Sequence, residues 1–64
     1  MTAIETYRKA NGFSQQALAK AINVSQGAIS QWENGLTFPG VHSLKAMAKL
    51  FGCKVDDLLE EHSA

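Results

Sequence analysis

Two short helical patterns separated by only three residues, within positions 14–35, constrain the fold of this chain more than any other feature. Ser14 is a candidate N-cap, and the helix predicted after it, over positions 15–22, carries one apolar stripe. The stripe consists of Leu18, Ala19 and Ile22. Asn23 tolerates the left-handed backbone with which a helix ends, and Ser25 is a candidate N-cap for a second helix. The sequence therefore predicts two helices joined by a tight turn.

The second helix has an apolar side and a polar side. Its apolar side, which we expect to face the core, consists of Ala28, Ile29 and Trp32. Its polar side consists of Gln26, Gly27, Ser30, Gln31 and Asn34. Amides and hydroxyls both donate and accept hydrogen bonds, and the base edges of a DNA major groove present the same mixture. We interpret positions 15–34 as a helix-turn-helix motif.

The sequence on either side of this motif also predicts helices. A first helix over positions 3–11 is stopped by Gly12, which accepts a left-handed backbone. After a break that contains Pro39, an apolar series with a period of about 3.6 residues predicts a fourth helix that ends at Gly52. The series is Val41, Leu44, Met47, Ala48 and Phe51. A short fifth helix follows, and its apolar residues are Val55, Leu58 and Leu59.

These elements together predict a compact all-α fold of five helices. We expect residues 1–64 to form a single domain, with the motif at 15–34 and a frayed polar tail at 60–64. A core in so small a domain supplies only about 3 to 5 kcal/mol of stability.

Several stretches of the sequence match, in order, features of one protein family. They are Gln15 at the start of the motif, Leu18 with Ala19, AISQWENG at 28–35, and GVHSLKAMAKLFGCKVDDLL after Pro39. In this order they resemble the Cro and lambda-repressor-like family, also called the XRE family, over nearly the whole chain. The last stretch is similar to the family's fourth helix, glycine stop and short fifth helix. The resemblance implies a lambda-repressor-like domain that binds DNA and is not an enzyme.

The resemblance also implies that Gln26 reads a base. An exposed glutamine near the start of a helix in the major groove can bond adenine N6 and N7 at once. In relatives, the glutamine that matches Gln15 contacts a phosphate and braces the recognition glutamine. We therefore expect Gln15 and Gln26 to act together, with two solvated glutamines as the alternative.

Further DNA contacts are expected around the same helix. The candidates for base contacts are Gly27, Ser30 and Gln31, and those for phosphate contacts are Arg8, Ser25 and Asn34. Gly27 either marks a close approach of the backbone to DNA or is tolerated near a helix start. Helix capping alone is enough to explain Ser25.

Arg8 and Glu33 match positions that pair in relatives, where the arginine joins the first helix to the end of the recognition helix. The resemblance therefore implies a structural ion pair between Arg8 and Glu33, a task that suits the bidentate geometry of arginine. The alternative is two solvated surface charges that contribute little.

The loop after the recognition helix departs from the family pattern. Relatives commonly carry Lys or Arg, directed at a phosphate, where this chain has Leu36. Leu36 and Phe38 either fold back on the core or form part of a contact between two subunits. With Leu59 of the last helix, they are the candidate dimer residues.

Composition limits the other possible functions. Net charge is zero, but residues 1–32 hold three basic and one acidic residue (+2), whereas residues 33–64 hold three basic and five acidic residues (−2). We therefore expect weaker non-specific DNA binding than in a strongly basic repressor. Cys53 has no partner for a disulfide within the chain, which favours a reducing cytoplasm, and with His42 and His62 it lacks the spacing of a metal site. No cofactor is expected, and no run of about 18 apolar residues predicts a membrane span.

We therefore predict a cytoplasmic, dimeric transcriptional repressor of the Cro or phage type that binds a palindromic operator in double-stranded DNA. A DNA-binding antitoxin or a restriction-modification controller is a close alternative, because these proteins share the domain. A helical protein-interaction module without DNA binding is another, because net charge is zero and Leu36 and Phe38 are apolar. Neither paired carboxylates nor a nucleophile with a base can be assembled into an enzyme site.

Overall fold

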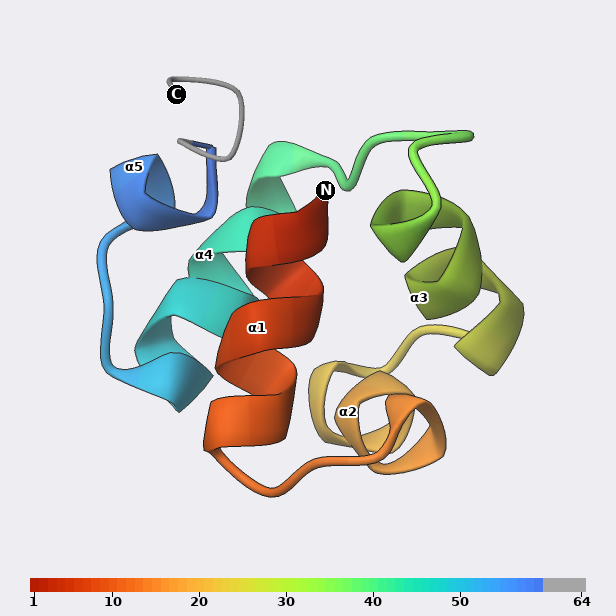
Figure 1. Ribbon diagram of the computed structural model, residues 1–64, viewed down its shortest axis with the longest axis horizontal. Helices are drawn as coiled ribbons and strands as arrows, with labels where there is room; N and C mark the ends of the chain where they lie inside the picture. The colour runs from red at the N-terminus through yellow and green to blue at the C-terminus, as the bar shows by residue number, and fades with distance from the viewer. Residues whose placement is uncertain (60–64) are drawn as a thin grey trace.

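A computed structural model describes residues 1–59, which form five α-helices joined by short connections (Figure 1). The helices are α1 (Thr2–Ala10), α2 (Gln15–Ile22), α3 (Gln26–Glu33), α4 (Val41–Phe51) and α5 (Val55–Leu58). The all-α prediction is confirmed for this part of the chain, in which no strand occurs. The tail predicted to fray, 60–64, lies outside the described residues.

Local signals in the sequence set the ends of α2 and α3. The Ser14 hydroxyl accepts a hydrogen bond from the Ala17 amide at 3.0 Å. The Ser25 hydroxyl accepts one from the Ala28 amide at 3.1 Å. Both bonds satisfy amides that the start of a helix leaves without a partner, as predicted for N-caps. Asn23 ends α2 with φ 61° and ψ 50°, the left-handed conformation expected of it.

The hydrophobic core draws on every helix of the described chain. Each helix contributes one large side chain that is completely buried, namely Ile4, Leu18, Ile29, Met47 and Leu58. Trp32 is also buried, as predicted. Beside this core the Phe51 ring lies 6.0 Å from the Tyr7 ring and 6.4 Å from the Phe13 ring, measured between ring centroids. Since all five helices meet in one core, the loss of one buried side chain affects the whole domain.

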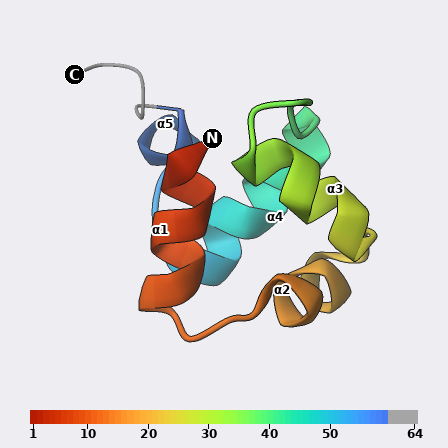
Figure 2. The same ribbon diagram turned by 45° about the vertical axis from the view of Figure 1, so that its right-hand side comes forward.

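Packing leaves one side of α3 open. α1 packs against α3 and α5, while α2 packs against α3 and α4. In Figures 1 and 2, α3 lies at an edge of the molecule, and no other helix covers its outer side. The fold therefore holds α3 against the core and leaves its polar side accessible.

Three expectations about element ends are corrected by the structure. Val41 was expected on the buried side of its helix, but it is 68% exposed, because α4 begins before it reaches the core and Leu44 is its first buried residue. Leu59 follows α5 instead of belonging to it and is 37% exposed. α1 begins and ends one residue earlier than predicted, at Thr2 and Ala10.

Leu18→Ala should lower the free energy of unfolding by about 2 to 5 kcal/mol, because it removes a fully buried side chain and leaves a cavity. That loss is comparable to the whole stability of so small a domain, about 3 to 5 kcal/mol. Urea unfolding followed by circular dichroism measures it. Leu50→Ala is the matched control, because Leu50 is 38% exposed and its truncation should cost less than about 1 kcal/mol. Equal losses in the two variants would contradict this description of the core.

Candidate nucleic-acid interface

The polar side of α3 is accessible along its length. Gln26, Gly27, Gln31 and Asn34 are exposed, and Ser30 is half-buried. The structure thus brings the predicted base-contact residues together on the side of α3 that faces away from the core. This surface offers neutral hydrogen-bonding groups, which suit base edges in a major groove.

Gly27 is not required by the packing of the protein. A Cβ atom at this position would meet the Ser25 hydroxyl oxygen at 3.9 Å, an ordinary van der Waals distance. The backbone of Gly27 is helical and has no positive φ. Glycine nevertheless costs about 1 kcal/mol relative to alanine inside a helix. The described fold therefore does not require glycine here, and because Gly27 is the second residue of α3, tolerance near a helix start stays the alternative to a close approach of DNA.

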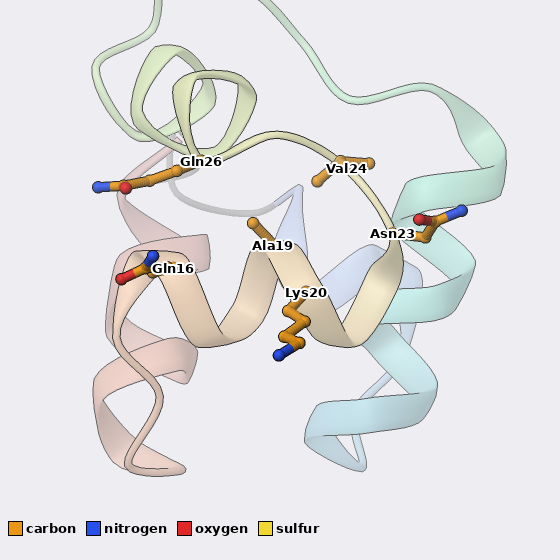
Figure 3. Close-up of a pocket in the computed structure, with 6 residues that line it drawn as sticks. All are labelled: Gln16, Ala19, Lys20, Asn23, Val24 and Gln26. Carbon is orange, nitrogen blue, oxygen red and sulfur yellow. The ribbon is translucent and has the colours of Figure 1, made fainter.

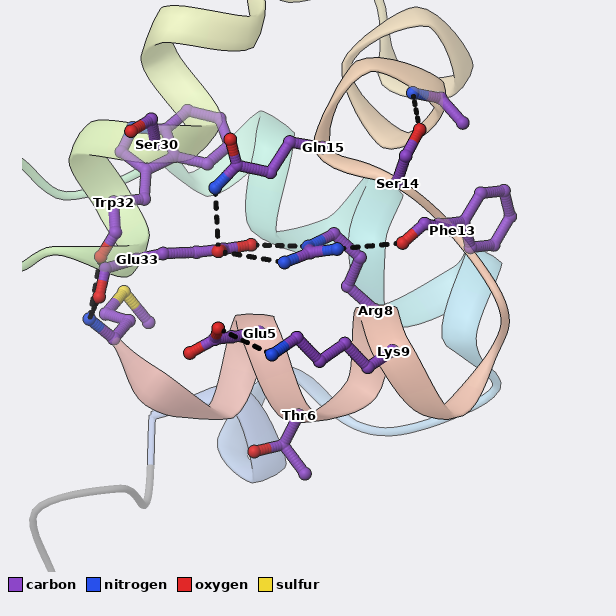
Figure 4. Close-up of polar contacts among 12 residues, drawn as sticks. Glu5, Thr6, Arg8, Lys9, Phe13, Ser14, Gln15, Ser30, Trp32 and Glu33 are labelled. Carbon is purple, nitrogen blue, oxygen red and sulfur yellow. Dashed lines mark hydrogen bonds and ion pairs between the residues drawn. The ribbon is translucent and has the colours of Figure 1, made fainter.

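A buried polar network anchors the end of α3 (Figure 4). The Glu33 carboxylate accepts hydrogen bonds from Arg8 Nε at 2.6 Å and from Arg8 Nη2 at 3.1 Å. Arg8 Nη1 donates to the Phe13 carbonyl oxygen at 2.9 Å. Gln15 Nε2 donates to Glu33 Oε1 at 3.0 Å. The predicted Arg8–Glu33 pair is confirmed, and the alternative of two solvated charges is wrong, since the side chains are only 9% and 5% exposed.

This network fixes the position of α3 relative to the start of α2 and to α1. Arg8 uses all three guanidinium nitrogens inside the protein, so a direct contact with phosphate would require this buried side chain to move. Gln15 was expected to brace Gln26. Within residues 1–59 it instead donates to Glu33, and no hydrogen bond joins the two glutamines. Gln15 remains half-buried beside α3, so part of its amide is accessible.

The network also shifts the pKa values of its two charged groups. The hydrogen bond to Glu33 raises the pKa of Arg8, against the smaller opposing effect of burial. Burial alone would raise the pKa of Glu33, but the hydrogen bonds from Arg8 and Gln15 outweigh it and the net pKa is lowered. Both shifts favour the charged forms, so the ion pair persists at neutral pH.

Two weaker side-chain contacts join the polar side of α3 to its surroundings. The Thr37 hydroxyl donates to Gln31 Oε1 at 3.4 Å, and Asn34 Nδ2 donates to the Ser30 hydroxyl at 3.4 Å. Sequence reasoning missed Thr37, as it missed the Phe13 carbonyl oxygen in the network. A backbone carbonyl has no signature in sequence, and nothing in the sequence pattern distinguishes Thr37 from other loop residues.

The loop between α3 and α4 carries an exposed apolar patch. Leu36 is 74% exposed, Phe38 is 77% exposed and Val41, at the start of α4, is 68% exposed. The alternative in which Leu36 and Phe38 fold back on the core is therefore wrong. In contrast, Pro39 between them is buried and ties the loop to the domain. We call Leu36, Phe38 and Val41 the loop patch.

The described residues offer neither a metal site nor a membrane-spanning helix. Among residues 1–59 no three His, Cys, Asp or Glu side chains lie close enough together to hold a metal ion. Cys53 is half-buried, and burial, followed by the nearby charge of Asp57, raises the pKa of its thiol. None of the helices described is both long and apolar enough to cross a membrane.

Glu33→Gln should destabilise the domain by about 1 to 3 kcal/mol at neutral pH, because it leaves the buried Arg8 guanidinium without a charged partner. Since the folded-state pKa of Glu33 is lowered, its stabilising charge is fully present above about pH 4.3 and is lost as the pH falls through the folded-state pKa. The difference in unfolding free energy between wild type and variant should therefore shrink below about pH 4.3. Urea unfolding at a series of pH values measures it.

Glu5→Gln provides the control for this experiment. Glu5 also faces a cation, Lys9, at 3.0 Å on the same helix, but the two side chains are 41% and 65% exposed. Its loss should cost about 0.3 to 0.5 kcal/mol. A Glu33→Gln penalty that stays constant from neutral to acid pH would show that the Glu33 charge does not stabilise the fold.

Comparisons with known proteins agree on one family. A helix-turn-helix family model matches residues 4–58. Repressor protein C2 of Salmonella phage P22 is 42% identical over 57 residues, which make up 89% of this chain and 26% of that protein. The HTH-type transcriptional activator BcrR of Enterococcus faecalis is 38% identical over 56 residues, 88% of this chain and 28% of the activator. The chain thus spans little more than a quarter of either relative.

Similarity extends to three-dimensional structure. The solution structure of the DNA-binding domain of the P22 C2 repressor superposes with a TM-score of 0.82 at 39% identity, covering 97% of this chain and 82% of that domain. The five-helix arrangement and the position of the motif are therefore those of a repressor DNA-binding domain. The chain belongs to the helix-turn-helix family of Cro and lambda-repressor-like (XRE) proteins.

Proposed function

We propose that this chain is a sequence-specific DNA-binding regulator of transcription, and that it represses by occupying an operator. The observation that carries the proposal is the accessible, uncharged polar side of α3, held by the Arg8–Glu33–Gln15 network. The C2 relative is a repressor, and its similar domain binds DNA. Another relative, BcrR, is an activator. Whether this chain represses or activates transcription is therefore the part of the proposal that depends most on the promoter.

In the proposed complex α3 enters the major groove. Gln26 makes the main base contact, and Gly27, Ser30 and Gln31 extend the contact along the helix. Gln31 Oε1 accepts a hydrogen bond from the Thr37 hydroxyl, and the NH₂ group of Gln31 remains to donate to a base acceptor. The phosphates lie near the helix starts and ends, at Gln15, Ser25 and Asn34. Binding itself regulates transcription, with no enzymatic step, and takes place in the cytoplasm where the DNA is.

Gln26→Ala should weaken binding to an operator selected from random DNA by about 1 to 3 kcal/mol and should barely change binding to unselected DNA. Fluorescence anisotropy with both duplexes measures the preference. Thr6→Ala is the control, because Thr6 points away from α3 on the far side of α1 (Figure 4). Full operator preference in Gln26→Ala would remove Gln26 from base reading. Failure of the wild-type protein to bind any duplex would instead favour the protein-interaction module.

We further propose that two copies bind one palindromic operator and meet through the loop patch. Leu36, Phe38 and Val41 expose apolar surface immediately after the recognition helix, near the place where the second subunit of a two-fold dimer would lie. Leu59 is a separate candidate at the end of α5, and α1 packs between α5 and α3. Because few apolar side chains are involved, the dimer should be weak in solution and tighten on DNA.

Phe38→Asp should therefore abolish cooperative binding to the palindromic operator and sediment as a monomer, while melting like wild type because Phe38 is 77% exposed. Leu59→Asp is the matched comparison and should retain cooperativity. Sedimentation velocity and operator titrations distinguish the two. Loss of cooperativity in Leu59→Asp alone would move the interface to α5, and retained cooperativity in a folded Phe38→Asp variant would exclude the loop patch.

A further inference from the structure

The loop after the recognition helix reverses direction at once and places Thr37 against the polar side of α3. The Leu36 amide donates to the Gln31 carbonyl oxygen at 2.9 Å, and the Gly35 amide donates to the Trp32 carbonyl oxygen at 3.2 Å. Gly35 has φ 76°, the left-handed conformation that this pair of backbone bonds requires. The position of Thr37 beside the end of α3 is therefore set by the backbone.

Gln31 is joined to this loop by its side chain as well as by its backbone. The Thr37 hydroxyl donates to Gln31 Oε1 at 3.4 Å. The oxygen and the NH₂ group of an amide point in different directions from one carbon atom, so turning Oε1 toward Thr37 turns the NH₂ group away from the loop. Both residues are exposed, so this contact belongs to the surface proposed to face DNA. Thr37 therefore sets which hydrogen-bonding group Gln31 presents.

A second hydrogen-bond donor lies beside Gln31 on the same side of α3. Asn34 Nδ2 donates to the Ser30 hydroxyl oxygen at 3.4 Å, which leaves the Ser30 O–H group to donate elsewhere. Ser30 is half-buried and Gln31 is exposed, so both groups are accessible. The second half of α3 thus presents two neighbouring donors, the Gln31 NH₂ group and the Ser30 O–H group.

Gln26, the first residue of α3, is not oriented in this way. Within residues 1–59 its amide has no hydrogen-bond partner. It lines a hollow of about 420 Å³ between α2 and α3, and Figure 3 shows its side chain extended from the start of the helix. An amide without a partner can present its oxygen and its NH₂ group to adenine N6 and N7 at once. The two glutamines of α3 therefore suit different bases.

We propose that Thr37 is a positioning residue that makes Gln31 a hydrogen-bond donor and so gives it a preference for guanine over adenine. Guanine presents two adjacent acceptors, O6 and N7, in the major groove, and they match the two donors at Gln31 and Ser30. Adenine presents the N6 amino group beside N7, and that amino group needs an acceptor. Thymine presents the single acceptor O4, which leaves one of the two donors unpaired. The inference rests on the proposed function, because it needs α3 in the major groove.

The test is the base preference of Thr37→Val, which keeps the shape of the side chain and removes its hydroxyl. Operators are selected from random duplexes with wild type and with Gln31→Ala, and the position whose preference is lost in Gln31→Ala is the one that Gln31 reads. Fluorescence anisotropy then gives the affinity for all four base pairs at that position. Wild type should favour a G·C pair over both orientations of A·T. In Thr37→Val this preference should fall by about 2- to 10-fold per half-site, because one orienting hydrogen bond is lost.

Thr37→Ser keeps the hydroxyl and should retain the preference. Thr6→Val is the matched control, because Thr6 is an exposed threonine of α1 whose hydroxyl donates to the Thr2 carbonyl oxygen at 3.0 Å, and it should bind like wild type. An unchanged preference in Thr37→Val, an equal loss of affinity for all four base pairs, or a wild-type preference for A·T at this position would each overturn the inference and leave the proposed function standing. A Gln31→Ala variant that loses no base preference would do the same. Absence of wild-type binding to any duplex would overturn both.

Discussion

The buried ion pair between Arg8 and Glu33 determines how the recognition helix sits in this domain. Removing two charges from water costs several kcal/mol, and a buried pair compensates only when its geometry is good and its remaining groups are bonded. Both conditions hold, because the pair is bidentate and the Phe13 carbonyl oxygen and Gln15 supply the further bonds. Apolar contacts in the small core have no preferred direction. The ion pair has a preferred direction, and it therefore fixes both the rotation of α3 about its axis and the position of its last turn.

The same pair shapes the chemistry of the surface that α3 presents. Glu33 is the one charged residue of α3, and its carboxylate is turned inward and neutralised. The outer side is left with amides, a hydroxyl and a glycine. Such groups gain little from long-range attraction to DNA, but each one leaves an unsatisfied donor or acceptor when it meets the wrong base. An interface of this kind discriminates between DNA sequences more by the binding free energy that it loses at a wrong site than by the affinity that it gains at the right one.

The sequence predicted the helices well because their signals are local. Ser14, Ser25, Asn23 and the glycine after α4 act within one turn of themselves, and all four were read correctly. The exposure of Leu36, Phe38 and Val41 could not be predicted from local signals, because it depends on where the core ends in three dimensions. The Arg8–Glu33 pair spans 25 positions, and only resemblance to a family indicated it. The Phe13 carbonyl oxygen had no signal at all.

Zero net charge is compatible with DNA binding once the location of the acidic groups is considered. Glu5 and Glu33 are paired within the protein, and Asp56 and Asp57 lie on α5, away from α3. These four acidic residues, which lie within residues 1–59, therefore reduce the general attraction to DNA without facing the proposed interface. Low non-specific affinity is useful to a regulator, because the genome offers on the order of a million or more competing sites. In the proposed dimer, two weakly binding domains joined on one operator would restore the affinity that is given up in this way. Zero net charge thus gives a physical reason for the proposed role of the apolar loop patch in dimerisation.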